Sequence, residues 1–299
     1  YLEFIEKLKV SVPRSNRLKI IYAEGREYEE TLTSMSDLAS TIIDVIVHYC
    51  IEAFKPFFAA TEDIAALLPD SRAGISRTLL RPYISPTLAK GIPYTDEYFI
   101  DLYYMLAENV HEGLVNLDYI KPLLEELNYT PEVVFEKGVY TIYARTWTGK
   151  RLPLPQAPSG IRESLTVALA LASKEEPYIV VIEEPEAHLH PRALRLLARL
   201  ISKSINELGK TVLITTHSDH LLYSINNLIA LSQTPEKAEK LGFHENEALN
   251  PNKVAAYLVK AIERKAVLEP LQVGPEGIPE EEFTRIAEEL AEERARILD

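Results

Sequence analysis

Two adjacent glutamates follow a run of residues that is typical of a buried strand. Glu183 and Glu184 come directly after residues 178–182, which are rich in β-branched side chains. Open α/β folds bind their ligands at the carboxyl ends of parallel strands. Two carboxylates there can take different roles: one can face a hydrated Mg²⁺, and the other can orient and deprotonate an attacking water. A Glu-Glu pair alone is more often a solvated strand end, so a functional role for it requires supporting features elsewhere in the sequence.

A histidine follows the next apolar strand. Residues 191–208 have the pattern of a helix, and residues 211–215 read as a second buried strand that ends in Thr216 and His217. A strand, a helix and a strand with short links form a βαβ unit, whose two strands lie parallel in one sheet. We therefore expect His217 to lie near Glu184, where an imidazole can contact a γ-phosphate or the attacking water. Taken alone, His217 is more simply a satisfied polar residue at a strand end.

A short polar turn precedes a strongly apolar helix that we expect over residues 164–173. Ser159 and Gly160 lie in this turn. Free backbone N–H groups and the helix dipole attract anions at a helix N-terminus, and a glycine lets a phosphate approach. Simple helix capping by the serine is the alternative interpretation.

The order of these three features is specific. Residues 183–191 read Glu-Glu-Pro-Glu-Ala-His-Leu-His-Pro, between the Ser-Gly turn and the Thr-Thr-His strand end. The arrangement resembles the C-terminal portion of an ABC-type ATPase head, in the branch of AAA-superfamily ATPases related to the OLD-family and chromosome-maintenance ATPases. The resemblance is close over residues 154–231. It is looser upstream at residues 68–74 and downstream near residues 277–283.

The resemblance implies a role for each matching residue. Glu183 takes the place of the Walker B acid, which holds Mg²⁺ through water, and Glu184 takes the place of the catalytic base. His217 matches the switch histidine. Ser159 and Gly160 match the signature that contacts the γ-phosphate of ATP bound to the other subunit.

The residues after the Walker B strand match the D-loop, which touches the opposite subunit in this family. They are Glu186, His188 and His190. Two departures affect the nucleotide geometry. Ile161 and Arg162 follow Gly160 where a second glycine and a glutamine are usual, and glutamate replaces the usual Walker B aspartate.

A phosphate-cradling Walker A loop, G-x-x-x-x-G-K-[ST], is missing from the sequence. Gly149-Lys150 does not qualify, because Arg151 follows and Ala144 occupies the position of the first glycine. Since the chain starts at Tyr1 and such loops lie near the N-terminus of ABC-type heads, we expect the Walker A lobe upstream. A separate polypeptide that supplies it, or a degenerate ATPase, are the alternatives.

The predicted fold class is therefore α/β, a P-loop NTPase of ABC type with a parallel-sheet core and a helical insert, without its N-terminal Walker A lobe. The resemblance implies Mg²⁺-dependent ATP hydrolysis in an ATP-sandwich homodimer, with little activity in this chain alone. It further implies work in DNA maintenance or anti-phage defence, with DNA or a nuclease as a possible partner.

Two other classes of function stay open. Four histidines, with the nearby glutamates, offer Zn²⁺ or Mn²⁺ ligands for a metal-dependent hydrolase. These histidines are His188, His190, His217 and His220. A scaffold that kept the fold and lost turnover is the third class, against which the intact Glu184 and His217 argue.

The other elements are expected from hydrophobic periodicity and turn residues. They are a hairpin over residues 17–32, a helix over 38–54, a strand over 63–68, mostly helix over 96–127 with breaks near Gly113 and Pro122, and a second hairpin over 133–148. The domain limits that we expect are 1–76 for the first part of the ATPase lobe, 77–128 for the helical insert, 129–264 for the ATPase core and 265–299 for an acidic, solvated helical tail.

The composition is that of a globular protein of 299 residues, with a net charge of −13 from 32 basic and 45 acidic residues. The acidic balance argues against a broad nucleic-acid-binding surface. A basic stripe on the helix over residues 191–208 is the local exception, and we favour pairing with carboxylates for it over contact with phosphate. The stripe comprises Arg192, Arg195, Arg199 and Lys203.

The composition also bears on location. The longest apolar stretches are too short to span a membrane, and the sequence shows no signal peptide. Cys50 is the single cysteine, which suits a reducing compartment. We therefore expect a cytoplasmic protein without a membrane partner. The excess of glutamate leans towards a thermophilic source.

Overall fold

The structure is a computed structural model, and it describes residues 9–11, 17–22, 26–31, 65–76, 94–136, 138–262 and 265–298. The chain divides into two compact units, Tyr1–Glu62 and Asp63–Asp299. The helix that we expect over residues 38–54 lies outside the described residues.

The first unit contains an antiparallel three-stranded sheet in the order β1-β2-β3. The strands are β1 (Lys9–Ser11), β2 (Arg17–Tyr22) and β3 (Arg26–Thr31). Strands β2 and β3 pair from Arg17 opposite Thr31 to Tyr22 opposite Arg26. The predicted hairpin over residues 17–32 is confirmed.

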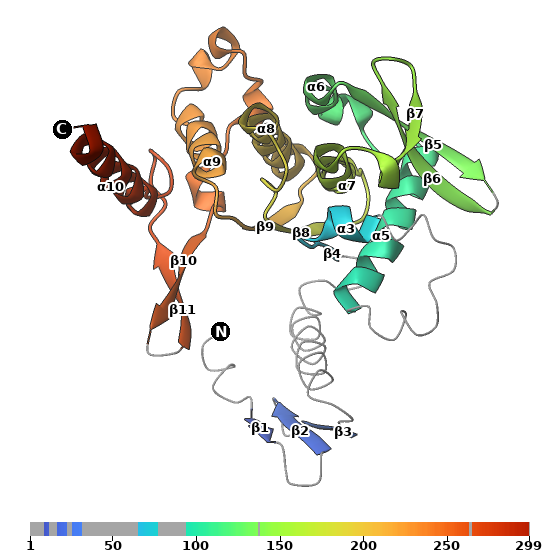
Figure 1. The fold of residues 1–299 in the computed structure, drawn as a ribbon, viewed down its shortest axis with the longest axis horizontal. Helices are drawn as coiled ribbons and strands as arrows, with labels where there is room; N and C mark the ends of the chain where they lie inside the picture. Colours follow the sequence, from blue (N-terminus) through green and yellow to red (C-terminus); the bar gives the residue numbers. More distant parts are fainter. Residues whose placement is uncertain are drawn as a thin grey trace. The chain divides into compact units, whose positions relative to one another are not determined.

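The second unit is built on a small parallel sheet in the order β4-β8-β9 (Figure 1). Its strands are β4 (Ala65–Leu68), β8 (Ile179–Glu183) and β9 (Thr211–Thr215). Strand β8 pairs in parallel with both neighbours, and α8 (Pro191–Glu207) connects it to β9. The α/β class, the expected strand near residues 63–68 and the βαβ unit are confirmed.

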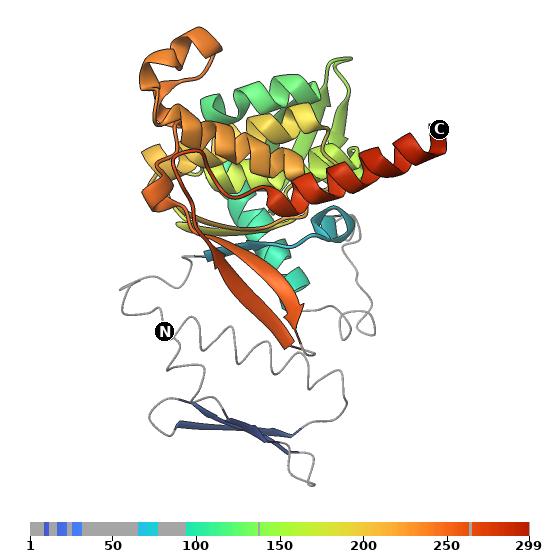
Figure 2. The same ribbon diagram turned by 90° about the vertical axis from the view of Figure 1, so that its left-hand side faces the viewer.

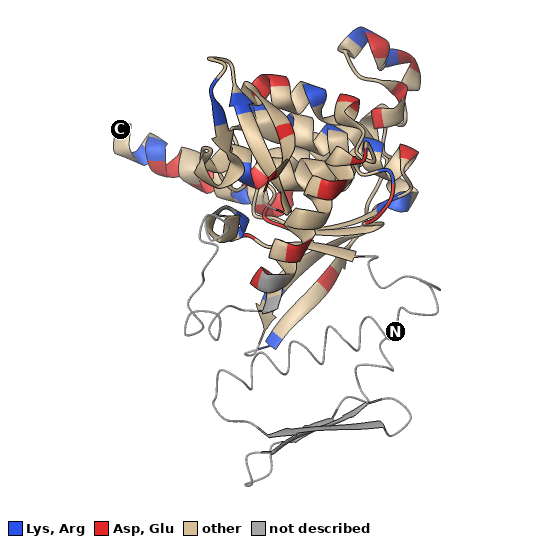
Figure 3. Ribbon diagram, turned by 90° about the vertical axis from the view of Figure 1, so that its right-hand side faces the viewer, with Lys and Arg blue, Asp and Glu red and all other residues tan. Residues whose placement is uncertain are grey.

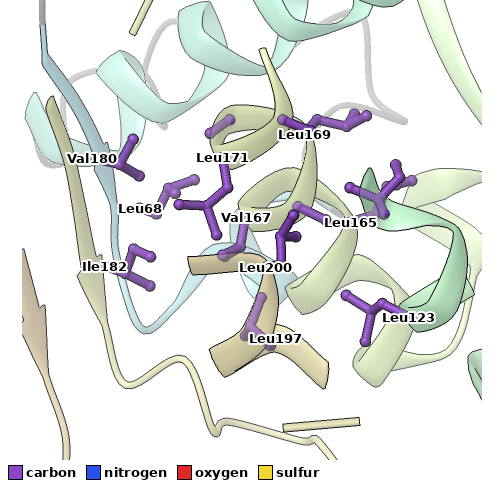
Figure 4. Close-up of a cluster of buried hydrophobic side chains, with 14 of the residues drawn as sticks. Leu68, Leu123, Leu165, Val167, Leu169, Leu171, Val180, Ile182, Leu197 and Leu200 are labelled. Carbon is purple, nitrogen blue, oxygen red and sulfur yellow. The ribbon is translucent and has the colours of Figure 1, made fainter. Parts of the chain in front are cut away.

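Helix α7 (Ser159–Ala172) forms the centre of the core, because every residue from Ile161 to Ala172 is buried. It lies with α8 on one face of the parallel sheet (Figure 2). Figure 4 shows Val180 and Ile182 of β8 pointing towards Val167 and Leu171 of α7, all of them fully buried. Burial of each such side chain contributes about 1.5–3 kcal/mol.

Helix α7 begins five residues earlier than predicted. We expected a helix over residues 164–173, with Ser159 and Gly160 in a turn before it, but both residues belong to the first helical turn. Polar side chains at positions 159, 162 and 163 hide the apolar periodicity there. The backbone N–H groups of Ile161 and Arg162 both donate to the Pro158 carbonyl, which fixes the helix start.

Two helices cover the region in which we expected mostly helix with two breaks. They are α5 (Tyr94–His111) and α6 (Leu117–Leu127). The break near Gly113 is confirmed, and this glycine has a φ of 72°. The break near Pro122 is wrong, because Pro122 lies inside α6.

Burial explains why α6 continues through its proline. An internal proline costs about 3 kcal/mol or more. Helix α6 buries Ile120, Leu123 and Leu124, and the side chain of Asn116 accepts a hydrogen bond at its N-terminus. Three buried side chains at about 1.5–3 kcal/mol each outweigh the cost of the proline.

An antiparallel sheet, β5-β6-β7, joins these helices to α7. Its strands are β5 (Tyr129–Glu136), β6 (Val139–Thr146) and β7 (Arg151–Pro153). The predicted second hairpin is confirmed, and Gly149 turns the chain from β6 into β7 with a φ of 78°. Basic and acidic side chains pair across this sheet, as in Arg145–Glu132 at 2.6 Å. Figure 3 shows basic and acidic segments interspersed rather than gathered into one basic band.

The C-terminal part contains α9 (Asp219–Leu231), the hairpin of β10 (Ala256–Ile262) and β11 (Lys265–Leu271), and α10 (Glu281–Leu298). No sequence signal predicted this hairpin, because no Gly, Asn or Asp lies between its arms and Pro270 argues against a strand. Helix α10 has no buried residue, as expected of a solvated helix. The helical tail that we expect over residues 265–299 is wrong in its first part, because residues 265–271 form β11 and pair with β10. Short 3₁₀ helices cover Leu154–Gln156, Pro235–Lys237, Glu239–Leu241, Glu245–Glu247 and Pro251–Lys253. In the described ranges no helix combines the length and apolarity needed to cross a membrane.

A buried lysine at the start of β9 gives a pH-dependent stability. Lys210 is 3% exposed, and its ammonium donates to the carbonyls of Glu175 at 3.0 Å and Pro177 at 2.5 Å. Burial lowers its pKa from 10.5 to about 8. Between these values the unfolded chain binds the proton and the folded chain does not, so the free energy of unfolding rises with pH.

We expect urea titrations from pH 7.5 to 10.5 to show this rise. Over this range the free energy of unfolding of the wild-type chain should rise by about 1–2 kcal/mol relative to that of Lys210→Met. This is somewhat less than the full pKa shift implies, since the two carbonyls favour the charged form. Lys240→Met, at an exposed position, is the control and should parallel the wild type. A constant difference between the wild type and Lys210→Met would contradict the assignment.

Candidate functional site

Three strand ends bring polar residues to one edge of the parallel sheet. Strands β4, β8 and β9 point the same way. Asp70 follows β4, Glu183 and Glu184 lie at the end of β8, and His217 follows β9. The sheet therefore places these side chains at one edge, as the sequence predicted for Glu184 and His217.

The two glutamates are engaged on opposite sides. The Oε2 atom of Glu183 accepts the backbone N–H of Asp70 at 3.2 Å, on the side of β4. The Oε1 atom of Glu184 lies 4.0 Å from Nε2 of His217, on the side of β9. The side chain of Glu184 is 44% exposed and that of His217 is 90% exposed. Adjacent carboxylates thus have different surroundings, which two different chemical roles require.

The backbone at Glu184 is left-handed, with a φ of 43°. Few residues other than glycine adopt this region, and such backbone conformations cluster at functional sites. The N–H of Glu184 donates to the Thr215 carbonyl at 2.9 Å, and its own carbonyl accepts the N–H of Ala187 at 3.0 Å. These bonds hold the glutamate at the turn where β8 ends.

The carboxylate of Glu186 holds the end of β9. Its Oε1 atom accepts the hydroxyl of Thr216 at 2.7 Å and the backbone N–H of His217 at 2.8 Å. The family resemblance predicts that Glu186, His188 and His190 lie in the D-loop. The ring of His190 accepts the N–H of Arg192 at 3.3 Å and so caps α8, whereas His188 is exposed with a φ of 59°.

The Ser-Gly turn is half-exposed at the start of α7. The N-cap residue is Pro158, which offers no side-chain hydrogen bond, so the alternative that Ser159 caps the helix is wrong. A Cβ added to Gly160 would lie 3.0 Å from the carbonyl oxygen of His188. The turn at Gly160 and the main chain of His188 therefore pack closely, and glycine fits between them without strain.

The two residues that depart from the usual signature point into the protein. Ile161 is 8% exposed and Arg162 is 4% exposed. The guanidinium of Arg162 donates to the carbonyl of Ala157 at 2.6 Å, within the segment before the helix. Both side chains therefore pack inside the protein and do not face the surface of the turn.

Arg72 is not among the predicted site residues, yet it is fully buried behind the strand ends. Its guanidinium donates to the carbonyls of Glu183 at 2.7 Å and Glu184 at 3.1 Å, and its Nε atom lies 2.7 Å from Oε2 of Glu163. Burial lowers the pKa of Arg72, while Glu163 and the carboxylates at the strand ends raise it. An available signal was that Arg72 closely follows a strand of the same sheet.

The metal-hydrolase alternative required several of the histidines and glutamates to converge. Within the described ranges, which include all of these residues, no group of three or more His, Cys, Asp or Glu side chains could hold a metal ion. His190 caps a helix instead, and Glu186 holds backbone and hydroxyl groups. The site therefore does not support a Zn²⁺ or Mn²⁺ cluster.

Half of the basic stripe on α8 is paired with a carboxylate, as we favoured. Arg199 lies 2.6 Å and Lys203 3.1 Å from Glu247, which is 2% exposed. Burial opposes the charge on Glu247, but the hydrogen bonds from Arg199 and its other partners hold its pKa below the usual value. Arg192 and Arg195 are exposed.

Residues 141–222 match the family described as "AAA domain, putative AbiEii toxin, Type IV TA system". The matched stretch runs from β6 into α9 and contains the Ser-Gly turn and both strand ends with their polar residues. The resemblance to an ABC-type ATPase head is thereby confirmed for this portion of the chain, residues 141–222.

A curated relative comes from the archaeon Methanopyrus kandleri. It is described as a putative ABC transporter ATP-binding protein and is 36% identical over 111 residues. The alignment spans 37% of this chain and 37% of the relative.

Partial structural similarity, with TM-scores below 0.5, is found to heads of SMC proteins. An Smc head bound to the C-terminal winged-helix domain of ScpA gives a TM-score of 0.44 at 13% identity, over 86% of this chain and 68% of that one. A Pyrococcus furiosus Smc head with an extended coiled coil, bound to the C-terminal domain of ScpA, gives a TM-score of 0.42 at 13% identity, over 92% of this chain and 74% of that one. The SMC head domain from Thermotoga maritima gives a TM-score of 0.36 at 10% identity, over 88% of this chain and 73% of that one.

Proposed function

We propose that this chain supplies the signature, Walker B, D-loop and switch-histidine half of an ATP-hydrolysing head. The observation that carries the proposal is the meeting of Glu184 and His217 at neighbouring strand ends, with their side chains 4.0 Å apart. Glu184 takes the proton of the attacking water, and His217 contacts that water or the γ-phosphate. Glu183, turned to the other side, serves the metal.

The residues present fit Mg²⁺ held through water. Mg²⁺ prefers oxygen ligands, keeps several waters and commonly takes only one or two carboxylates from the protein. Glu183 offers a half-exposed carboxylate whose Oε2 atom is oriented by the N–H of Asp70. When bound, Mg²⁺ neutralises charge on the phosphates of ATP.

Partners complete the site in this proposal. A Walker A lobe, in the same protein or on a separate chain, cradles the phosphates of ATP. The half-exposed turn at Ser159 and Gly160 faces the γ-phosphate held by a second copy, so that ATP joins two subunits, and the D-loop with Glu186, His188 and His190 borders that contact. The work coupled to hydrolysis, which the family resemblance suggests, is DNA maintenance or anti-phage defence, with DNA or a nuclease as partner.

The 299-residue chain alone should bind ATP poorly and hydrolyse it negligibly. Its sequence has no loop of backbone N–H groups and lysine for the β- and γ-phosphates. Isothermal titration calorimetry with ATP and Mg²⁺ should detect no sub-micromolar binding, and phosphate release should stay at the background rate.

The same measurements on a protein that also carries the Walker A lobe should show both binding and turnover. Sub-micromolar affinity of the isolated chain would overturn the assignment of phosphate binding to the Walker A lobe. Absence of turnover in the complete protein would overturn the proposed function itself.

A further inference from the structure

Arg72 connects two parts of the molecule that are distant in sequence. It lies in α3 (Arg72–Ser76), directly after the turn that follows β4. All three nitrogen atoms of its guanidinium are engaged: Nε with Glu163, Nη1 with the carbonyls of Pro69 and Glu183, and Nη2 with the carbonyl of Glu184. One side chain therefore contacts the end of β8 and helix α7 together.

The contacts on the two sides differ in kind. Towards β8, Arg72 donates to main-chain carbonyls at 2.7 Å and 3.1 Å, so it acts on the backbone of Glu183 and Glu184 and leaves their carboxylates available. Towards α7, it forms an ion pair with Glu163, whose side chain is 1% exposed, and it donates to the Glu163 carbonyl at 3.3 Å. Glu163 follows Gly160 by less than one helical turn.

A guanidinium suits this position for a geometric reason. Its planar, rigid fork presents donors in fixed directions, whereas an ammonium is a single point of charge. Because Glu184 has a left-handed backbone, its carbonyl points where a regular strand would not place it, and Arg72 supplies a donor there. A shift of α7 would move Glu163 and, through the guanidinium, the carbonyls of the two glutamates.

We propose that Arg72 is a positioning residue that sets the backbone of Glu183 and Glu184 and couples it, through Glu163, to the Ser159–Gly160 turn. The proposal rests on the proposed function for its consequence: an event at the turn is transmitted to the base in the same chain. The linkage itself is a property of this chain and is testable without nucleotide.

The test is hydrogen–deuterium exchange of the 299-residue chain, read by mass spectrometry. Arg72→Lys keeps the charge beside Glu163 but cannot hold both glutamate carbonyls. We expect exchange to rise about tenfold or more in two segments together, residues 159–164 and 183–187, with α5 and β6 unchanged. Exchange that rises evenly throughout the core, or in one of the two segments alone, would overturn the coupling.

Arg199→Lys is the matched control. Arg199 also pairs with a buried glutamate, Glu247, and donates to a carbonyl, that of Gly242. Its replacement should loosen residues 242–247 and leave both segments around Arg72 as they are. If Arg72→Lys fails to fold, the apolar pair Arg72→Met with Glu163→Leu takes its place, since such pairs often replace buried ion pairs without loss of stability, and the same exchange pattern is expected.

A second readout separates the linkage from the proposed function. In the protein that carries the Walker A lobe, Arg72→Lys should lower kcat by about 10–100-fold, because small displacements of a base are costly, with KM for ATP changed less than about twofold. Arg199→Lys should leave both constants unchanged. An inactive wild-type protein would refute the proposed function, while the exchange experiment would still decide whether Arg72 couples the two segments; unchanged kcat in an active protein would refute the positioning role.

Discussion

Glu184→Gln is expected to lower ATP turnover by ~10²–10⁴-fold in the protein that carries the Walker A lobe. Glutamine keeps the size and the hydrogen bonding of the side chain but cannot accept the proton of the attacking water. ATP binding should survive, and ATP-dependent dimers should last longer because hydrolysis no longer separates them. Steady-state phosphate release and ATP titration measure the two effects.

Two further variants make this result specific. Glu183→Gln should instead weaken the binding of Mg²⁺ and of the nucleotide, since the two carboxylates face opposite neighbours. Glu207→Gln, exposed at the far end of α8, should behave as the wild type. Unchanged turnover in Glu184→Gln would place the base elsewhere.

Gly160→Asp is expected to block ATP-dependent dimer formation while leaving ATP binding to each subunit nearly intact. The substitution puts a carboxylate where the γ-phosphate of the partner's ATP must approach, and like charges repel strongly in a partly buried site. Sedimentation velocity with ATP and Mg²⁺, in a Glu184→Gln background that stops turnover, measures the dimer directly. We expect dimerisation to weaken by about tenfold or more.

Gly160→Ala is the control that the structure requires. Any Cβ at this position lies 3.0 Å from the His188 carbonyl oxygen, so aspartate and alanine share that steric strain and differ in charge. If alanine blocks dimers as strongly as aspartate, packing against the D-loop is responsible. If aspartate dimerises as well as its parent, ATP does not join two copies of this chain through this turn.

The parallel strands β8 and β9 were predictable because their sequences are strongly apolar and rich in β-branched residues. Residues 178–182 are almost all apolar, and a short helical segment with a proline start and a glycine stop separates them from β9. The end of a parallel strand then fixed where Glu184 and His217 would meet, without any knowledge of the rest of the chain.

The buried polar linkage was not predictable in the same way. Arg72 and Glu163 are separated by 91 positions, and a charged residue in sequence reads as solvent-exposed unless its partner is known. The start of α7 was missed because polar residues hide its apolar periodicity. The hairpin of β10 and β11 was missed because no glycine marks its turn.

The left-handed backbone at Glu184 has a consequence for how this sequence can drift. A residue other than glycine held there costs of order 1–3 kcal/mol, so glycine, and to a lesser extent asparagine, would make the folded chain more stable. Random mutation under selection for stability alone would move position 184 towards those residues. A variant library screened for thermal stability should therefore enrich Glu184→Gly. A library of the protein that carries the Walker A lobe, screened for ATP turnover, should return glutamate, so position 184 is a local measure of the trade-off between stability and activity.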